Sequence, residues 1–262
     1  MTVLKQEFKQ NFKSLLIWSL AIGLICYGCI LLYKNVEHQL RDMAQLYANM
    51  GEMTKALGLD KVSLATLDGY FATEIVMMFG LGAGMFAAML GSASLSKEEE
   101  GHTSEFLYTL PIRRSSIVFQ KYASVLVTLL LFNALIIGLE LLGIWQIDLD
   151  FSYQSFFQYH ALAILMQVEI TSLTFLVSAV NTKKQTGLAL GLTLILYAMD
   201  MMARVIPDIE FLNYLTPYYF ANGADVFSQE TVEPIYFIIS LGVTVLSLLA
   251  SLTIYQKKDL SA

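Results

Sequence analysis

Residues 15–33 read LLIWSLAIGLICYGCILLY and contain no charged side chain. A helix that crosses a bilayer needs about 20 mostly apolar residues, and this stretch has that length. It is longer than the apolar region of a signal peptide and lacks the small-residue cleavage site of one, which indicates a retained span. Because backbone polar groups in lipid must be paired within the segment, the stretch is predicted to be helical.

Five further stretches share this composition, in a chain that is 56% hydrophobic and only 15% charged. Soluble domains carry about 25% charged residues, so most of this chain is expected to lie in lipid. The sequence therefore predicts an all-α polytopic membrane protein, a single transmembrane domain over residues 1–262 with six transmembrane helices. The predicted spans are 15–33, 72–95, 117–143, 158–180, 186–206 and 235–255.

The lysines and arginines predict the orientation of these spans. Basic residues gather on the cytoplasmic side of membrane proteins, and an even number of spans puts both termini on one side. With both termini in the cytoplasm, 11 of the 16 basic residues lie inside, and the outer loops 144–157 and 207–234 contain none. We therefore expect a multi-pass protein of the cell (plasma) membrane, and we expect the cell to be bacterial. The inner basic residues are Lys5, Lys9, Lys13, Lys97, Arg113, Arg114, Lys121, Lys183, Lys184, Lys257 and Lys258.

Three segments outside the spans carry weaker patterns. Residues 2–14 place apolar residues every three to four positions beside three lysines, which predicts an N-terminal amphipathic interfacial helix on the inner leaflet. The alternative is a short solvated extension of the first span. Residues 34–71 keep a similar period and predict one or two short amphipathic helices, which would act either as a gate or as packing. The stretch 211–223, FLNYLTPYYFANG, is aromatic and suits an interfacial or re-entrant cap.

The longest cytoplasmic loop, residues 95–121, begins and ends with recognisable signals. Ser96 followed by Glu99 fits a capping box, which would start a helix. Residues 103–110 can form about two helical turns with an apolar face, and Pro111 would end that helix. A short helix held between two spans can press on a cytosolic partner, whereas the alternative is a solvated loop whose charges only set the topology.

Charged groups within the spans are candidates for function, because a central charge costs about 2.5–3.5 kcal/mol on insertion. Glu74 and Glu140 lie near the outer ends of spans and are expected to anchor them at the interface. Glu169 lies near the middle of the fourth span, either as a protonated or paired structural carboxyl or as part of a polar pathway. Asp200 and Arg204 are four residues apart and can pair on one helix face.

The remaining polar and small residues favour packing over chemistry. The run GLGAG, residues 80–84, spaces small residues four apart, which lets helices approach closely. Cys26 and Cys29 are expected to be buried thiols rather than a redox or metal pair. The three histidines are scattered, so we expect no histidine beside a partner, no metal site and no catalytic site. The net charge of −6 argues against nucleic-acid binding.

The stretch EEEGHTSEFLYTLPIRRSSIVFQK, residues 98–121, resembles the loop after the second span in type 2 ABC transporter permeases. The residues that carry the resemblance are Gly101, Thr103, Glu105, Phe106, Leu107, Pro111, Arg114, Ile117 and Lys121. The six spans, the amphipathic N-terminal segment and the basic tail YQKKDL are similar to that family as well.

The resemblance implies the permease subunit of an ATP-driven exporter, which is not itself an enzyme. In that family the loop forms a coupling helix that docks on a separate ATPase subunit. The chain contains no G-x-x-x-x-G-K-[ST] loop, so ATP and Mg would bind to the partner and no cofactor to this chain. The implied ATPase-coupling residues are Gly101, Thr103, Glu105, Phe106, Leu107, Leu110, Pro111 and Arg114.

The resemblance further implies a substrate pathway between two permease copies, either identical or related, lined by the second and fifth spans. The pathway candidates are Glu169, Gly84, Gly191, Asp200 and Arg204. Two other classes of function stay open on the residues alone. A self-sufficient secondary transporter or channel would show internal repeats, and none is convincing. A membrane-embedded enzyme would show convergent His, Asp or Glu side chains on the spans.

Overall fold

The computed structural model describes residues 2–47, 51, 54–55, 57–103 and 112–258. Within those residues every regular element is helical, and six helices are long and apolar enough to cross a membrane. Short elements connect them. The long helices are α1 (Thr2–Tyr47), α4 (Val76–Ala93), α7 (Arg114–Ile147), α8 (Tyr153–Val180), α9 (Thr186–Val205) and α11 (Pro234–Lys257). The helix α3 (Leu67–Tyr70) and the π-helix η1 (Phe71–Ile75) run into α4 without a break and form the second span with it. The connectors are α5 (Lys97–Glu100), the 3₁₀-helix η2 (Pro207–Tyr214) and α10 (Gly223–Phe227).

Six long apolar helices lie where the six spans are predicted, and their ends differ from the predicted ones by a few residues except at the first. Helix α1 runs without a break from Thr2 to Tyr47, so residues 2–14 are its first turns rather than a separate element. The same helix also extends into the segment 34–71, where the sequence predicts one or two short separate helices. No proline interrupts residues 2–47, and the helix packs along α7, so nothing in this stretch stops it.

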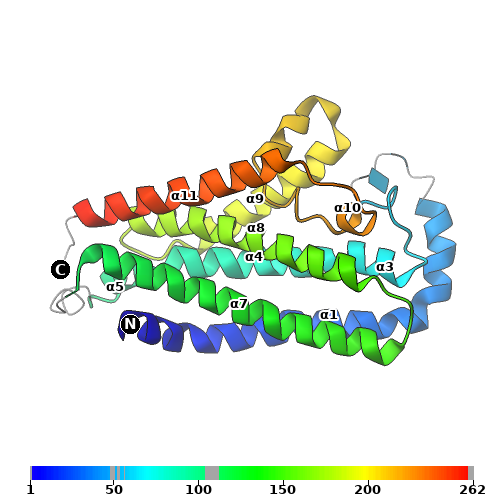
Figure 1. Ribbon diagram of the computed structural model, residues 1–262, viewed down its shortest axis with the longest axis horizontal. Coiled ribbons are helices and arrows are strands. Elements are labelled where there is room, and N and C mark those ends of the chain that lie inside the picture. The colour runs from blue at the N-terminus through cyan, green and yellow to red at the C-terminus, as the bar shows by residue number, and fades with distance from the viewer. Residues whose placement is uncertain (1, 48–50, 52–53, 56, 104–111, 259–262) are drawn as a thin grey trace.

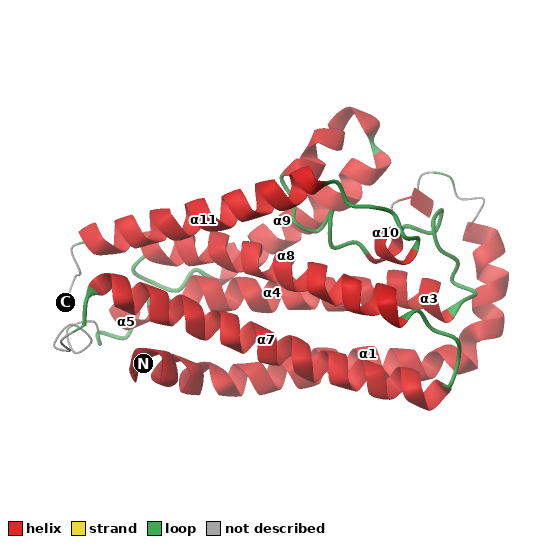
Figure 2. Cartoon of the chain, viewed as in Figure 1, coloured by secondary structure: helices red, strands yellow, loops and turns green. Residues whose placement is uncertain are grey.

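Both termini lie at one end of the bundle (Figure 1). We name it the terminal end, and the opposite end, where the last turns of α1 bend across the bundle, the distal end. Helices α1 and α7 lie side by side along one edge, as Figure 2 also shows. Helix α4 contacts α8 and α9 in the interior, and α11 packs against α8.

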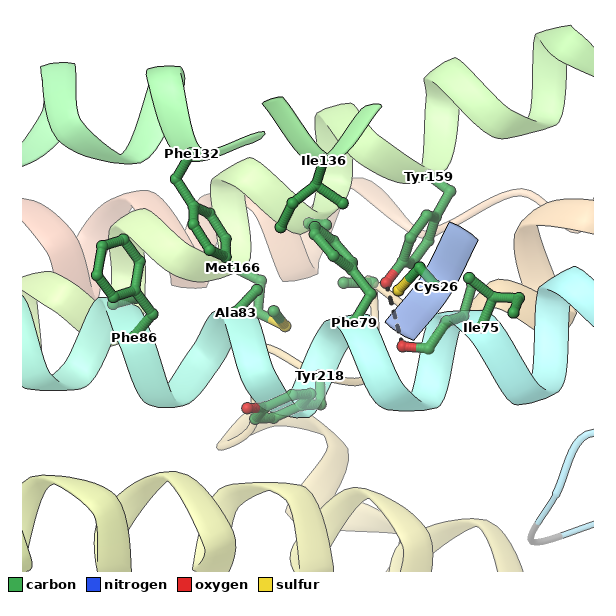
Figure 3. Close-up of a cluster of buried hydrophobic side chains, with 14 of the residues drawn as sticks. Cys26, Ile75, Phe79, Ala83, Phe86, Phe132, Ile136, Tyr159, Met166 and Tyr218 are labelled. Atoms are coloured by element: carbon green, nitrogen blue, oxygen red, sulfur yellow. Dashed lines mark hydrogen bonds between the residues drawn. The ribbon is translucent and has the colours of Figure 1, made fainter. Parts of the chain in front are cut away.

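The core is centred on α4, between α7 and α8 (Figure 3). Phe86 of α4 packs against Phe132 of α7, with ring centroids 4.6 Å apart, and Phe79 meets Tyr159 of α8 in an edge-on contact. A Cβ at Gly91 would lie 2.2 Å from Thr174 Oγ1, so this glycine lets α4 approach α8 closely. Packing of this kind associates helices in lipid, where burial of apolar surface between them brings little.

Candidate functional site

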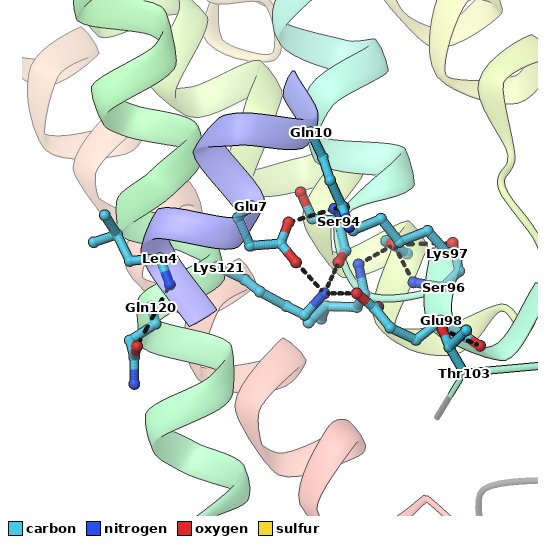
Figure 4. Close-up of polar contacts among 12 residues, drawn as sticks. Leu4, Glu7, Gln10, Ser94, Ser96, Lys97, Glu98, Thr103, Gln120 and Lys121 are labelled. Atoms are coloured by element: carbon cyan, nitrogen blue, oxygen red, sulfur yellow. Dashed lines mark hydrogen bonds and ion pairs between the residues drawn. The ribbon is translucent and has the colours of Figure 1, made fainter. Parts of the chain in front are cut away.

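A buried lysine lies at the centre of a group of polar contacts at the terminal end (Figure 4). Lys121, on α7, is 0% exposed, and its Nζ lies 2.9 Å from Glu7 Oε1 of α1 and 2.5 Å from Glu98 Oε1 of α5. The same ammonium donates to the backbone oxygen of Ser94 at 2.8 Å. A buried charge must be paired and hydrogen-bonded, and here the partners come from three separate helices or their ends. We call these four residues the Lys121 cluster.

Lys97 of α5 extends the Lys121 cluster by pairing with Glu7 and donating to Gln10 Oε1 at 2.7 Å. Burial lowers the pKa of Lys97, and the nearby Lys121 ammonium lowers it further against the opposing effect of Glu7. Burial also raises the pKa of Glu98, although the Lys121 ammonium offsets part of that shift. The opposed charges therefore hold one another in place, and they tie the first turns of α1 to α5 and α7.

A second set of contacts joins α5 to the end of α11 and to the loop between α8 and α9. Glu99 Oε1 lies 2.7 Å from Lys258 Nζ, and that ammonium also donates to the backbone oxygen of Asn181 at 2.8 Å. Glu100 accepts a hydrogen bond from the Lys184 backbone N–H at 3.0 Å. All three carboxylates of the run EEE are thus ion-paired or hydrogen-bonded to groups on other elements, so α5 is fixed on several sides.

The expected capping box at the start of α5 is wrong, although the helix itself is present. The Ser96 hydroxyl donates to Ser92 O and makes no cap bond to the helix. Ser96 has helical dihedral angles that continue from α4, whereas a capping serine needs an extended conformation. Glu99 instead pairs with Lys258.

Three of the eight predicted coupling residues lie in the described part of the chain. Gly101 ends α5, and the Thr103 backbone N–H donates to Glu98 O at 2.8 Å. Arg114 begins α7 and donates to the backbone oxygens of Gln256 and Lys258 at 3.2 and 3.0 Å. The predicted residues outside the described ranges are Glu105, Phe106, Leu107, Leu110 and Pro111.

At the distal end, the predicted pairing of Asp200 with Arg204 is confirmed, at 3.0 Å between Oδ1 and Nε. The Arg204 guanidinium also lies 2.9 Å from Asp225 and donates to the Tyr219 backbone oxygen at 3.0 Å. Lys61 reaches Asp225 and Glu230 at 2.9 and 2.6 Å. Burial acts to lower the pKa of Lys61, but its hydrogen bonds to these two carboxylates outweigh it and raise the pKa.

The other pathway candidates are not brought together. Gly84 of α4 faces α9 and the loop that follows η2, because a Cβ there would lie 2.0 Å from Tyr218 Oη and 3.1 Å from Thr193. A Cβ added at Gly191 of α9 would meet no neighbouring atom within 4 Å, so this face of α9 is open. Glu169 is buried on α8, beside Ser240 of α11 rather than beside Asp200.

The expectation that no histidine lies beside a partner is wrong. His160 Nε2 of α8 is 2.8 Å from Glu140 Oε2 of α7, and both side chains are buried. Glu140 therefore points into the bundle instead of anchoring the interface. Asn133 of α7 and Gln167 of α8 exchange two hydrogen bonds, at 2.8 and 3.0 Å. Cys26 and Cys29 are free thiols, and among the described residues no three candidate metal ligands gather.

A sequence signal for these two pairs exists in the hairpin of α7 and α8. Glu140 lies seven residues before the end of α7, and His160 lies seven residues after the start of α8. Asn133 and Gln167 lie fourteen residues from the same ends. In an antiparallel helical hairpin, positions equally far from the connection lie at the same depth, so polar residues at matched distances are candidate partners.

The sequence was compared with those of known protein families. The sequence matches the family described as ABC-2 family transporter protein over residues 1–260. A search of curated proteins returned no match. The match covers all six spans and both ends of the bundle described above. The chain belongs to the ABC-2 transporter family, as a multi-pass membrane transport subunit that carries no catalytic ATPase domain.

Proposed function

We propose that this chain is the permease of an ATP-driven exporter, working with a second permease copy and with separate ATPase subunits. The terminal end is the cytoplasmic end, and residues 101–113 form the part that docks on the ATPase. ATP and Mg bind to that partner. Transport through the bundle follows when the ATPase moves this segment.

The observation that carries the proposal is how firmly the two ends of the segment 101–113 are held. On one side, α5 is fixed by the Lys121 cluster and by the bonds of Glu99 and Glu100. On the other side, α7 begins at Arg114, which is bonded to the chain after α11. A push on a segment with anchored ends is passed to the helices that hold it, and here those are α1, α4, α7 and the end of α11.

The test is removal of the apolar side chains that would fill a groove on the ATPase. Fully burying such a side chain is worth about 1.5–3 kcal/mol, so two of them anchor a modest interface. The double variant Phe106→Ala with Leu107→Ala should lower the amount of copurified ATPase by about tenfold or more per mole of permease. Glu105 contributes to orientation at the rim rather than to affinity.

The matched control removes the same two residue types from the outer face of α7. Phe119 and Leu130 are 56% and 55% exposed there, so Phe119→Ala with Leu130→Ala should leave ATPase binding unchanged. If the segment packs on its own bundle instead, the Phe106/Leu107 variant will lose abundance while each surviving molecule binds the ATPase normally. That result would contradict the docking role.

A further inference from the structure

A cavity of about 100 Å³ lies between the second span and α9 at the distal end. Its walls come from η1 and α4 on one side and from Tyr197 and Asp200 of α9 on the other. Residues of the segments 57–64 and 218–224 cover it. Gly80 lines the cavity, and its lack of a side chain contributes to the open volume. A Cβ there would meet only Tyr159 Oη, at 3.5 Å.

Glu74 gives this cavity an unpaired carboxylate. It lies on the π-helix η1 and lines the cavity, and within the described residues it forms no hydrogen bond or ion pair. Its charge acts on Cys29, Tyr70 and Tyr197, and none of these three groups is a cation. Single π-helical turns inside α-helices are frequent at functional sites.

Two tyrosines form an aromatic corner in the same cavity. The rings of Tyr197 and Tyr218 meet nearly at right angles, at 79°, with centroids 5.3 Å apart. Tyr218 is 4% exposed, and its hydroxyl has no hydrogen-bond partner among the described residues. Aromatic faces beside carboxylates are the surroundings that bind quaternary and alkylated ammonium groups.

In the ion-pair network that begins at Asp200 in the cavity wall, the carboxylates outnumber the cations. Arg204 is shared between Asp200 and Asp225, and Lys61 is shared between Asp225 and Glu230. These two cations face three carboxylates, and Glu74 is a fourth. A positively charged ligand at Glu74 would therefore bring this group of side chains closer to neutrality.

We propose that the Glu74–Tyr197–Tyr218 cavity is a binding site for an alkylammonium group, carried either by a soluble molecule or by a lipid headgroup. The carboxylate supplies the countercharge and the two rings enclose the methyl or methylene groups. The inference rests on the proposed function only in treating the bound molecule as the transported substrate. Binding itself needs neither the ATPase nor a second type of chain.

Choline is the probe, measured by equilibrium binding to the purified full chain in phosphatidylglycerol nanodiscs, with empty nanodiscs subtracted. The comparison ligand is the tert-butyl analogue, in which carbon replaces the ammonium nitrogen. We expect choline to bind and the uncharged analogue to bind much more weakly. Glu74→Gln should weaken choline binding by about tenfold or more while leaving the analogue unaffected. Gly80→Ala, which adds a methyl group to the cavity wall, should weaken both ligands.

The matched control is Glu233→Gln, the same change at an exposed distal carboxylate outside the cavity, and it should bind choline as the wild type does. Nanodiscs that contain phosphatidylcholine identify the source: suppression of choline binding indicates a lipid headgroup, and unchanged binding indicates a soluble ligand. No choline binding, equal binding of the analogue, or full binding by a folded Glu74→Gln chain would overturn the proposal. Because no ATPase is present, failure here is separate from failure of the ATPase-docking test.

Discussion

At the scale of single residues, two glycines that look alike in sequence have different surroundings. The family resemblance implies that Gly84 of the second span and Gly191 of the fifth line a pathway between two permease copies. Gly84 makes room for the Tyr218 hydroxyl within the chain, whereas the space beside Gly191 is empty. The pathway role of Gly191 is therefore testable without disturbing the fold, and that of Gly84 is not.

We predict that Gly84→Val lowers the free energy of unfolding by about 1–3 kcal/mol, because the new side chain overlaps Tyr218. Gly191→Ala should instead leave stability unchanged or raise it by up to about 1 kcal/mol, since alanine favours the helix. Unfolding midpoints of the purified chain in detergent measure both. A Gly84→Val chain as stable as the wild type would show that Tyr218 moves aside freely.

At the scale of elements, the Lys121 cluster joins three helices that are far apart in sequence. Glu7 and Lys121 are separated by 114 positions, and Glu98 and Lys121 by 23. The Lys121 ammonium is the common partner of both carboxylates, so the first turns of α1 and the helix α5 are held to α7 by one side chain. Its loss would release both at once.

Lys121→Met should therefore destabilise the chain by about 3 kcal/mol, because it leaves buried carboxylates without their common partner. Adding Glu98→Gln should recover part of the loss by removing one of the unpaired charges. Thermal unfolding of the purified variants gives the comparison, with Lys13→Met at an exposed position of α1 as the control. Equal midpoints for Lys121→Met and Lys13→Met would contradict the structural role of the cluster.

At the scale of the whole molecule, the two ends of the bundle differ in which charged residues they contain. The terminal end gathers lysines that pair with acidic residues of α1 and α5, and the distal end has loops in which acidic residues dominate. This asymmetry, together with the preference of basic residues for the cytoplasm, favours cytoplasmic termini.

The orientation is tested with single cysteines in a chain whose Cys26 and Cys29 are replaced by alanine. Asp150→Cys, in the exposed connection of α7 and α8, should react with an impermeant maleimide added to intact cells. His102→Cys, exposed after α5, should react only after the membrane is permeabilised. The reverse labelling pattern would show that the termini lie outside.

The sequence by itself determined the helical class, the number of spans and the pair of Asp200 with Arg204. These features are local, because hydropathy is summed over about 20 consecutive residues and a pair four apart shares one helix face. The specific residues that carry the family resemblance are close together in the sequence too, since they lie within residues 98–121. The single helix from Thr2 to Tyr47 does not follow from the sequence, because an amphipathic pattern does not show whether the helix ends before the span.

Only the tertiary structure decided which polar groups of different elements meet. Lys61 pairs with Asp225 across 164 positions, and Lys121 pairs with Glu7 across 114. His160 and Glu140 meet because α7 and α8 form a hairpin of matched depth. No local pattern contains the separations of the two lysine pairs. The matched distances of Glu140 and His160 from the hairpin connection identify that pair only once the ends of α7 and α8 are known. A charge buried in lipid or protein takes whatever partner the packing of helices brings within reach, so the packing selected the partners that the sequence left open.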